Sequence, residues 1–293
     1  MEKTMFENEL KKELTSNLPS DYEVSTKEVV KEEGTLTGIY CAKKDKNDTT
    51  AAPLFYVENL YEQYSNGASI KEMAQYIIEN SVGAELDILA GINTTFDIQN
   101  RDFALSHVCE VLVGLNAKEL IEKRNLFYTP LENLGLYIIY EVRGTMNGRD
   151  CCVKVSNDYL NSVGITEAEM IIAAKINTEK MASKEFVPLW KVLGSPEMEN
   201  CELYFLGSEY HGAISVFYAD LKSFADKHNC NLYLIPSSVH EWLVYLDNGN
   251  FTKEQLKSMV ECVNSTEVKP SEQLSDYVFY YDKNAETFAR LDG

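Results

Sequence analysis

Two hydroxyls, one imidazole and one carboxylate lie within five consecutive residues near the C-terminal end of the chain. They belong to the segment Ser237-Ser238-Val239-His240-Glu241, which stands between two stretches typical of strands. Nucleophilic hydrolases and transferases use a serine hydroxyl activated by a histidine, with a carboxylate on the far nitrogen of the imidazole. A turn would bring Ser237 or Ser238 back toward His240. The segment is therefore a candidate site for catalysis or for ligand binding.

The same residues also fit a turn that only supports the fold. On a regular strand from residue 239 to 246, His240 and Glu241 point to opposite faces, so Glu241 is poorly placed to orient the imidazole unless a bulge re-aims it. Pro-Ser-Ser is ordinary turn chemistry, in which the hydroxyls bond neighbouring backbone groups. The sequence contains no Gly-x-Ser-x-Gly motif. We expect a structural turn with a hydrogen-bonded histidine, and retain ligand binding and nucleophilic catalysis as alternatives.

Metal and cofactor signatures are missing from the sequence. His107, His211 and His228 are scattered, with no pair at helical spacing and no His-Glu-x-x-His motif. We expect His107 to be partly buried in a helical stretch, His211 to lie in a hairpin turn and His228 near a helix end, where a cation suits the dipole. No glycine-rich phosphate loop occurs, and Arg143 and Arg149 are expected to be solvated at a hairpin tip. We therefore predict no metal and no cofactor.

The chain is strongly acidic, with a formal net charge of −19 at pH 7 and no basic segment. Duplex nucleic acid and anionic membranes attract basic surfaces, so both are poor candidates for partners.

No apolar run approaches the ~20 residues of a membrane span, and the N-terminus lacks a signal-peptide pattern. The seven cysteines include no Cys-x-x-Cys, which favours free, buried thiols in a reducing compartment. We expect a soluble, cytoplasmic protein.

The first part of the chain alternates between helical and extended patterns. Met5, Leu10 and Leu14 recur near helical spacing among charged residues, which indicates an amphipathic helix. The elements expected in this part are, in order, a helix over residues 2–16, strands over 22–30 and 36–41, and a helix over 54–64.

Three segments carry the pattern Ser/Thr-x-x-Glu/Gln, and they begin at Ser69, Thr166 and Thr252. In such a capping box the hydroxyl accepts a backbone N–H three residues on, and the Glu or Gln reaches back to the N–H of the cap. Apolar residues at helical spacing follow each one, so each predicts a helix of about three turns. Whether the three boxes mark an internal repeat stays open.

The C-terminal part reads strand-strand-helix-strand-strand-helix. These elements are expected at Glu202–Leu206, Ala213–Tyr218, Asp220–His228, Leu232–Ile235, Val239–Leu246 and the helix after Thr252. Earlier, Leu136–Val142 and Cys151–Val155 flank a hairpin turn at Asn147-Gly148. Hairpins imply antiparallel pairing, so the predicted class is α+β, with antiparallel or mixed sheets and capped helices packed on them.

We expect an N-terminal α+β region, residues 1–131, and a C-terminal α+β region, residues 132–293, with one continuous domain as the alternative.

Several motifs follow one another in the order of a known bacterial family. They are Leu54-Phe55-Tyr56-Val57-Glu58, Val155-Ser156-Asn157-Asp158-Tyr159-Leu160, the run from Leu232 to Glu241 with its specific Ile-Pro-Ser-Ser-Val-His-Glu, and Leu274-Ser275-Asp276 before Tyr280-Tyr281-Asp282. The chain thereby resembles domain of unknown function 5688, seen mainly in anaerobic gram-positive bacteria. The resemblance covers nearly the whole chain and is loose over residues 97–131. It implies an intracellular protein with a suggested link to mobile-element gene neighbourhoods, and it implies no catalytic residues.

Three functions fit these features. The first is a non-catalytic protein-interaction or regulatory factor that binds a protein partner or a second copy of itself, because cofactor motifs are missing and abundant tyrosines suit protein interfaces. The alternatives are a hydrolase or transferase, and a binder of a small-molecule ligand, both built on Ser237, Ser238, His240 and Glu241. We expect the first, so the sequence leans against an enzyme.

Overall fold

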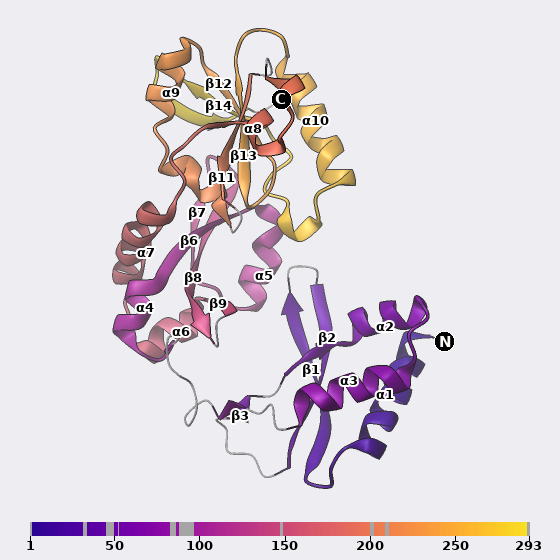
Figure 1. Cartoon of the computed structure of the whole chain (residues 1–293). Coiled ribbons are helices and arrows are strands. Elements are labelled where there is room, and N and C mark those ends of the chain that lie inside the picture. Colours follow the sequence, from indigo (N-terminus) through magenta and orange to yellow (C-terminus); the bar gives the residue numbers. More distant parts are fainter. Residues whose placement is uncertain are drawn as a thin grey trace. The chain divides into compact units, whose positions relative to one another are not determined.

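Antiparallel pairing joins the strands throughout the described part of the chain, as the hairpin signals predict. The computed structural model describes residues 2–31, 34–44, 50–51, 53–82, 86–87, 97–146, 149–199, 202–208 and 211–291. Helices pack on these sheets, so the predicted α+β class is confirmed (Figure 1). The chain divides into two units, Met1–Thr95 and Phe96–Gly293.

The first unit is a small sheet covered by helices. Its main strands lie in the order β1-β2-β4, and β3 pairs with β5. The elements are α1 Lys3–Asn17, β1 Tyr22–Lys31, β2 Gly34–Lys43, β3 Thr50–Ala51, β4 Phe55–Tyr56, α2 Val57–Ser65, α3 Ile70–Ser81 and β5 Leu86–Asp87. The predicted first helix and the first two strands are confirmed. The segment 54–64, expected to be wholly helical, is a short strand followed by a helix.

The core of this unit packs α1 against the sheet. Phe6, Leu10 and Leu14 are fully buried, and they share a cluster with Ile39 of β2. Met5, which we expected in the apolar stripe, is 59% exposed. The i, i+4 spacing of Phe6, Leu10 and Leu14 fits one helix face better than a stripe that starts at Met5, so Phe6 takes the buried position.

The second unit begins with a four-stranded sheet around the long strand β8. β6 pairs along one edge of β8, and β7 and β9 pair in succession along the other. The elements are α4 Arg101–His107, β6 Val108–Val113, η1 Leu115–Ala117, α5 Lys118–Lys123, β7 Tyr128–Leu131, β8 Leu136–Met146, β9 Arg149–Lys154, α6 Asn157–Val163 and α7 Glu167–Met181. The two predicted strands are confirmed as β8 and β9, and their turn at residues 147–148 lies outside the described residues.

The boundary between the two units does not lie at residue 131, where we expected it, because paired strands cross that position. We expected regions 1–131 and 132–293, but β7 and β8 form one hairpin in which Leu131 pairs with Leu136. Paired strands belong to one sheet, and domain boundaries fall where few contacts cross. The division lies after Thr95 instead.

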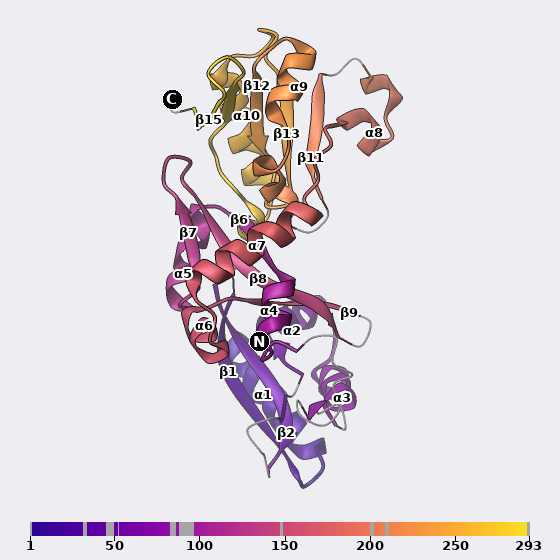
Figure 2. The ribbon, with the colours of Figure 1, turned by 90° about the vertical axis from the view of Figure 1, so that its left-hand side faces the viewer.

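The rest of the second unit is a six-stranded sheet in the order β10-β11-β13-β12-β14-β15. Its elements are β10 Val187–Pro188, α8 Leu189–Leu193, η2 Pro196–Met198, β11 Leu203–Gly207, η3 Gly212–Phe217, α9 Leu221–His228, β12 Leu232–Pro236, β13 Glu241–Leu246, α10 Lys253–Thr266, η4 Pro270–Glu272, β14 Phe279–Asp282 and β15 Thr287–Arg290. Helices α9 and α10 lie on opposite faces of this sheet (Figures 1 and 2). Alternate residues of β12 serve the two faces: Leu232 and Leu234 pack toward α9, and Tyr233 and Ile235 toward α10.

Two elements beside the candidate turn differ from the prediction. Ala213–Tyr218, expected to be the second strand of a hairpin, forms the 3-10 helix η3 instead. Both edges of β11 are already taken, by β10 and β13, so no place remains beside it for that strand. Strand β13 begins at Glu241, so Val239 and His240 belong to the turn. The observed order here is therefore β11-η3-α9-β12-β13-α10.

One hydrophobic core runs through both sheets of the second unit. Tyr140 of β8 and Trp242 of β13 are almost fully buried in it. Helix η3 contacts β6 of one sheet and β11 and β13 of the other. Its Ala213 and Val216 are buried in the shared core, and the Ala213 carbonyl accepts the indole N–H of Trp242 at 2.7 Å. The 3-10 helix therefore joins the two sheets.

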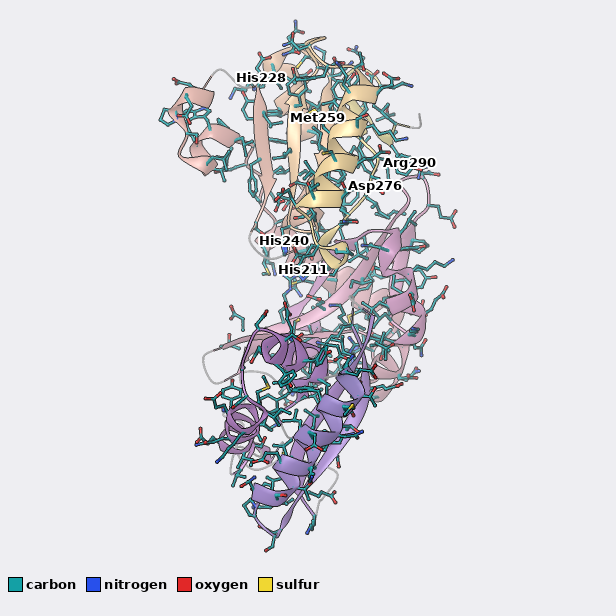
Figure 3. The ribbon with its side chains drawn as sticks, turned by 90° about the vertical axis from the view of Figure 1, so that its right-hand side faces the viewer. His211, His228, His240, Met259, Asp276 and Arg290 are labelled. Atoms are coloured by element: carbon teal, nitrogen blue, oxygen red, sulfur yellow. The ribbon has the colours of Figure 1, made fainter. Side chains whose placement is uncertain are left out.

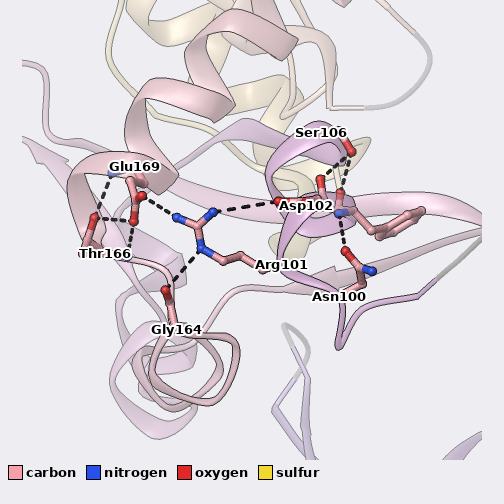
Figure 4. A network of polar contacts seen from close by, with 8 residues as sticks. Asn100, Arg101, Asp102, Ser106, Gly164, Thr166 and Glu169 are labelled. Atoms are coloured by element: carbon pink, nitrogen blue, oxygen red, sulfur yellow. Dashed lines mark hydrogen bonds and ion pairs between the residues drawn. The ribbon is translucent and has the colours of Figure 1, made fainter.

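All three predicted capping boxes are confirmed, at the starts of α3, α7 and α10. In α7 the hydroxyl of Thr166 accepts the N–H of Glu169 at 3.3 Å, and Glu169 accepts the N–H of Thr166 at 3.0 Å. Arg101 pairs with Glu169 and donates to the Gly164 carbonyl at 3.4 Å (Figure 4). The start of α4 is thereby tied to the start of α7.

The helices of the described segments are short, and α1 and α7 reach 15 residues each. A membrane span needs about 20 predominantly apolar residues. Within those segments, no helix has the length and apolar character to cross a membrane.

Candidate functional site

The candidate turn is closed by its own side chains. The hydroxyl of Ser238 donates to Oε1 of Glu241 at 2.9 Å and accepts the backbone N–H of His240 at 3.0 Å. The N–H of Ser238 donates to the Glu241 carbonyl at 3.3 Å. Ser238 is only 7% exposed, while Ser237 is half-buried. The hydroxyl of Ser238 is therefore committed to the turn.

His240 makes its contact with a different segment. Its Nδ1 accepts the backbone N–H of His211 at 3.0 Å, and the two rings lie 5.5 Å apart, centre to centre (Figure 3). A neutral imidazole that accepts at Nδ1 carries its proton on Nε2. A catalytic triad needs the other tautomer, in which Nδ1–H donates to a carboxylate and Nε2 accepts from serine. The four candidate residues are adjacent, but the contacts described for them do not form a Ser–His–carboxylate relay.

The turn holds the end of β11 against the start of η3. The carbonyl of His240 accepts the N–H of Ser208 at 3.2 Å, and that of Val239 accepts the N–H of Ala213 at 3.2 Å. Gly212 permits this approach, because a Cβ there would lie 2.5 Å from the His240 carbonyl oxygen. His211 precedes it with a left-handed φ of 50°. The turn therefore fixes the backbone from which η3 begins.

A cavity of about 1010 Å³ lies beside η3, within the second unit. Its walls come from β6, the β8–β9 hairpin, the C-terminal end of α7 and η3. Polar residues on these walls include Glu110, Arg143, Thr178, His211 and Ser215. We call it the Glu110 cavity. Its volume is typical of sites for small molecules.

Glu141 of β8 is fully buried at the centre of an ion cluster. Its Oε2 lies 3.6 Å from Nε of Arg143, and its Oε1 lies 3.3 Å from Nζ of Lys154. The expectation that Arg143 is solvated was wrong, because its side chain is only 19% exposed and is drawn in by the buried carboxylate. The side chain of Arg149 lies outside the described part of the chain. Removing one partner of such a buried pair leaves a charge without compensation.

Burial disfavours the charged form of His211. Burial lowers the pKa of its imidazole; Glu141 opposes this shift, and the charges of Lys154 and Arg143 add to it. The ring therefore enters the cavity wall as an uncharged hydrogen-bonding group rather than as a cation.

Glu110 is the buried carboxyl group of the cavity wall. It is 3% exposed, and the hydroxyl of Tyr218 donates to its Oε2. Its Oε1 has no hydrogen-bond partner among the described residues. Burial raises the pKa of Glu110, while the Tyr218 hydrogen bond and the charge of Lys175 act in the opposite direction. Its own N–H donates to the hydroxyl of Thr178 at 2.8 Å, which fixes the backbone beside α7.

The other histidines also differ from expectation. His107 is exposed at the last position of α4, stacked on Phe103 with ring centres 3.9 Å apart, because the chain turns into strand β6 directly after it. His211 lies at the start of η3 rather than in a hairpin. His228 ends α9 as expected, but burial lowers its pKa, so a cation is not favoured there.

Thiols line part of the cavity, but they do not build a metal site. In the described ranges, no group of three or more His, Cys, Asp or Glu side chains is placed to hold a metal ion. Cys41 and Cys109 are buried free thiols, as expected, whereas Cys262 is exposed. The Sγ of Cys109 lies 3.5 Å from Sδ of Met181 on the cavity wall. This contact gives the wall a polarisable, weakly polar patch.

Sequence reasoning missed Glu110, although one signal was present. The run Val108–Val113 is apolar apart from this one carboxylate, and it is a strand, whereas the stretch around His107 was expected to be helical. All six residues of the resulting strand are buried. A lone acid in a buried strand is a costly placement that points to a special role. Its partner Tyr218 lies 108 residues away, so no local pattern could identify it.

Replacing His240 tests its role in holding the start of η3. His240→Ala removes the acceptor of the His211 N–H, so the free energy of unfolding of the second unit should fall by about 1–3 kcal/mol. His240→Asn keeps an acceptor near the Nδ1 position and should lose less. Urea unfolding followed by tryptophan fluorescence measures this unit alone, because both tryptophans lie in it. Equal losses in the two variants would show that the acceptor is unimportant.

Replacing Glu110 by glutamine should stabilise the protein at neutral and alkaline pH. The folded state holds the Glu110 proton to higher pH than the unfolded state, whose pKa is near 4.5, so wild-type stability falls as the pH rises through the interval between the two values. Glutamine cannot ionise and still accepts from Tyr218. We expect Glu110→Gln to unfold at higher urea concentration at pH 8, by roughly 1 kcal/mol, with the difference shrinking toward pH 4. The exposed Glu132→Gln is the control, and a destabilised Glu110→Gln at pH 8 would contradict the expectation.

Comparison with known proteins agrees with the sequence pattern. A family model described as a family of unknown function, DUF5688, matches residues 3–283. Neither the curated proteins nor the solved structures gave a match. Because the matched segment covers nearly the whole chain, this protein belongs to the DUF5688 family.

Proposed function

We propose that this chain is a non-catalytic binding protein that takes up a small ligand in the Glu110 cavity. The observation that carries the proposal is a buried carboxyl group, with one oxygen lacking a hydrogen-bond partner among the described residues, on the wall of a cavity of about 1010 Å³. Buried polar groups are nearly always paired in folded proteins, and an exception calls for an explanation. A bound ligand would supply the missing partner.

The candidate turn supports this proposal over the hydrolase or transferase alternative. Ser238 is hydrogen-bonded to Glu241, and His240 accepts a backbone N–H at the nitrogen that a triad would direct to a carboxylate. These contacts favour a supporting role for the turn, which holds the start of η3 and thereby one wall of the cavity. The sequence-based alternative of a small-ligand binder built on Ser237, Ser238, His240 and Glu241 places the ligand elsewhere, because none of these four residues lines the Glu110 cavity.

A protein partner or self-association remains a second candidate, in line with the regulatory role that the sequence favours. Met259 and Val263 lie one turn apart on α10, with 51% and 44% of their surfaces exposed (Figure 3). Exposed aliphatic residues at this spacing suit a helix-mediated contact. Sedimentation velocity tests self-association: Met259→Asp should weaken it, and a wild-type coefficient that does not change with concentration would count against it.

We further propose that the protein acts in the cytoplasm. Buried free thiols such as Cys41 and Cys109 suit a reducing compartment. The net charge of −19 favours neither duplex nucleic acid nor anionic membranes as partners.

Filling the cavity should abolish ligand binding. Ala182, at the end of α7, is half-buried on the cavity wall, whereas Ala168, in the first turn of the same helix, is exposed away from it. In a thermal-shift screen with small amines, alcohols and carboxylates, at least one compound should raise the melting temperature of the wild type and of Ala168→Trp alike. The same compound should not stabilise Ala182→Trp, because only the folded, open cavity binds it.

The proposal fails if no compound shifts the wild-type melting temperature. It fails equally if the active compounds stabilise Ala182→Trp as much as Ala168→Trp, because they would then bind elsewhere.

A further inference from the structure

One oxygen of the Glu110 carboxyl group, itself buried, is left without a hydrogen-bond partner among the described residues. Tyr218 already donates to Oε2, while Oε1 has no hydrogen-bond partner among the described residues. A guanidinium group binds carboxylates best through two parallel hydrogen bonds, which need both oxygens. A quaternary ammonium group has no N–H to donate. A primary ammonium group, which donates along separate N–H bonds, matches one available oxygen.

A charge at this position must be desolvated, because Glu110 lies on an apolar, buried face of β6. Val108 and Leu112, which share the face of Glu110 on β6, are fully buried apolar residues of the core. An apolar residue at position 110 would continue that face, whereas an acid must be desolvated. The presence of a carboxyl group is therefore better explained by what it binds than by what it packs against.

Arg143, a cation on the cavity wall, is already paired with Glu141. Lys175 of α7 acts on Glu110 at longer range, but no salt bridge to Glu110 forms within the described ranges. The net charge of −19 also attracts cations and repels anions. An anionic ligand would have to approach a buried acid, whereas a cation would neutralise it.

Most of the exposed surface of the cavity wall is apolar. The hydroxyl of Thr178 already accepts the N–H of Glu110, and that of Ser215 accepts the N–H of Ser183 at 3.1 Å. Ile214 and Met181 add apolar surface to the same cavity. These contacts suit a ligand whose polar head reaches Glu110 and whose body is small and apolar.

We propose that the ligand of the Glu110 cavity is a small primary amine, and that its ammonium group binds Oε1 of Glu110. This inference rests on the proposed function, because it assigns the ligand class of the same cavity.

Three probes that share a ring and differ in the head group test it: benzylammonium, benzyl alcohol and benzoate. Their dissociation constants are measured by ligand-observed NMR at pH 7.5 with the wild-type chain, Glu110→Gln and Ala182→Trp. Benzylammonium should bind the wild type at least tenfold more tightly than the other two, and Glu110→Gln should remove that preference while benzyl alcohol binds as before. In wild-type protein labelled with ¹³C, benzylammonium should also shift the Glu110 carboxyl resonance, which keeps the test valid if Glu110→Gln folds poorly.

The outcomes separate the two proposals. If any of the probes binds the wild type but not Ala182→Trp, and benzylammonium has no advantage or binds Glu110→Gln equally well, the ligand class is wrong while the binding cavity stands. An unmoved Glu110 resonance during saturation with benzylammonium overturns the assignment of Glu110. If none of the probes binds the wild type, or all bind Ala182→Trp unchanged, both proposals are overturned.

Discussion

The second unit depends on the contact between the turn after β12 and the start of η3. Three hydrogen bonds meet there: the carbonyls of Val239 and His240 accept backbone N–H groups, and Nδ1 of His240 accepts another. They require a glycine at position 212, where a Cβ would strike the His240 carbonyl. Because η3 starts from this point, the contact decides where the helix covers Trp242 and where Tyr218, just beyond η3, meets Glu110.

In this arrangement the reactive residue types of the turn are engaged in hydrogen bonds within the fold. The imidazole of His240 accepts a backbone N–H, and the hydroxyl of Ser238 accepts a backbone N–H and donates to Glu241. The carboxyl oxygen of Glu110 that lacks a partner among the described residues lies on β6 instead. A buried acid with one oxygen lacking a partner in the described segments lowers stability, and proteins tolerate such groups at sites where binding requires them. The turn that supports the fold and the buried carboxyl group of Glu110 therefore belong to segments far apart in the sequence.

Local information was enough to predict some elements from the sequence and not others. The capping boxes at Ser69, Thr166 and Thr252 were predictable because both members of each box lie within four residues. The segment Ala213–Tyr218 was misjudged because its strand-like composition does not reveal that both edges of β11 are occupied. Glu110 was missed for a similar reason, since its environment is set by η3 and α7 rather than by its neighbours in sequence.

The continuous core of the second unit also limits how its cavity can change shape. Jaw-like closure requires two bodies joined by a hinge with little packing between them. Here Ala213 and Val216 of η3 are buried in a core shared by both sheets, and separating the sheets would expose that core to water. The packing of the shared core therefore holds the walls of the cavity in place. A pocket whose walls are fixed in this way loses little conformational entropy when it is filled.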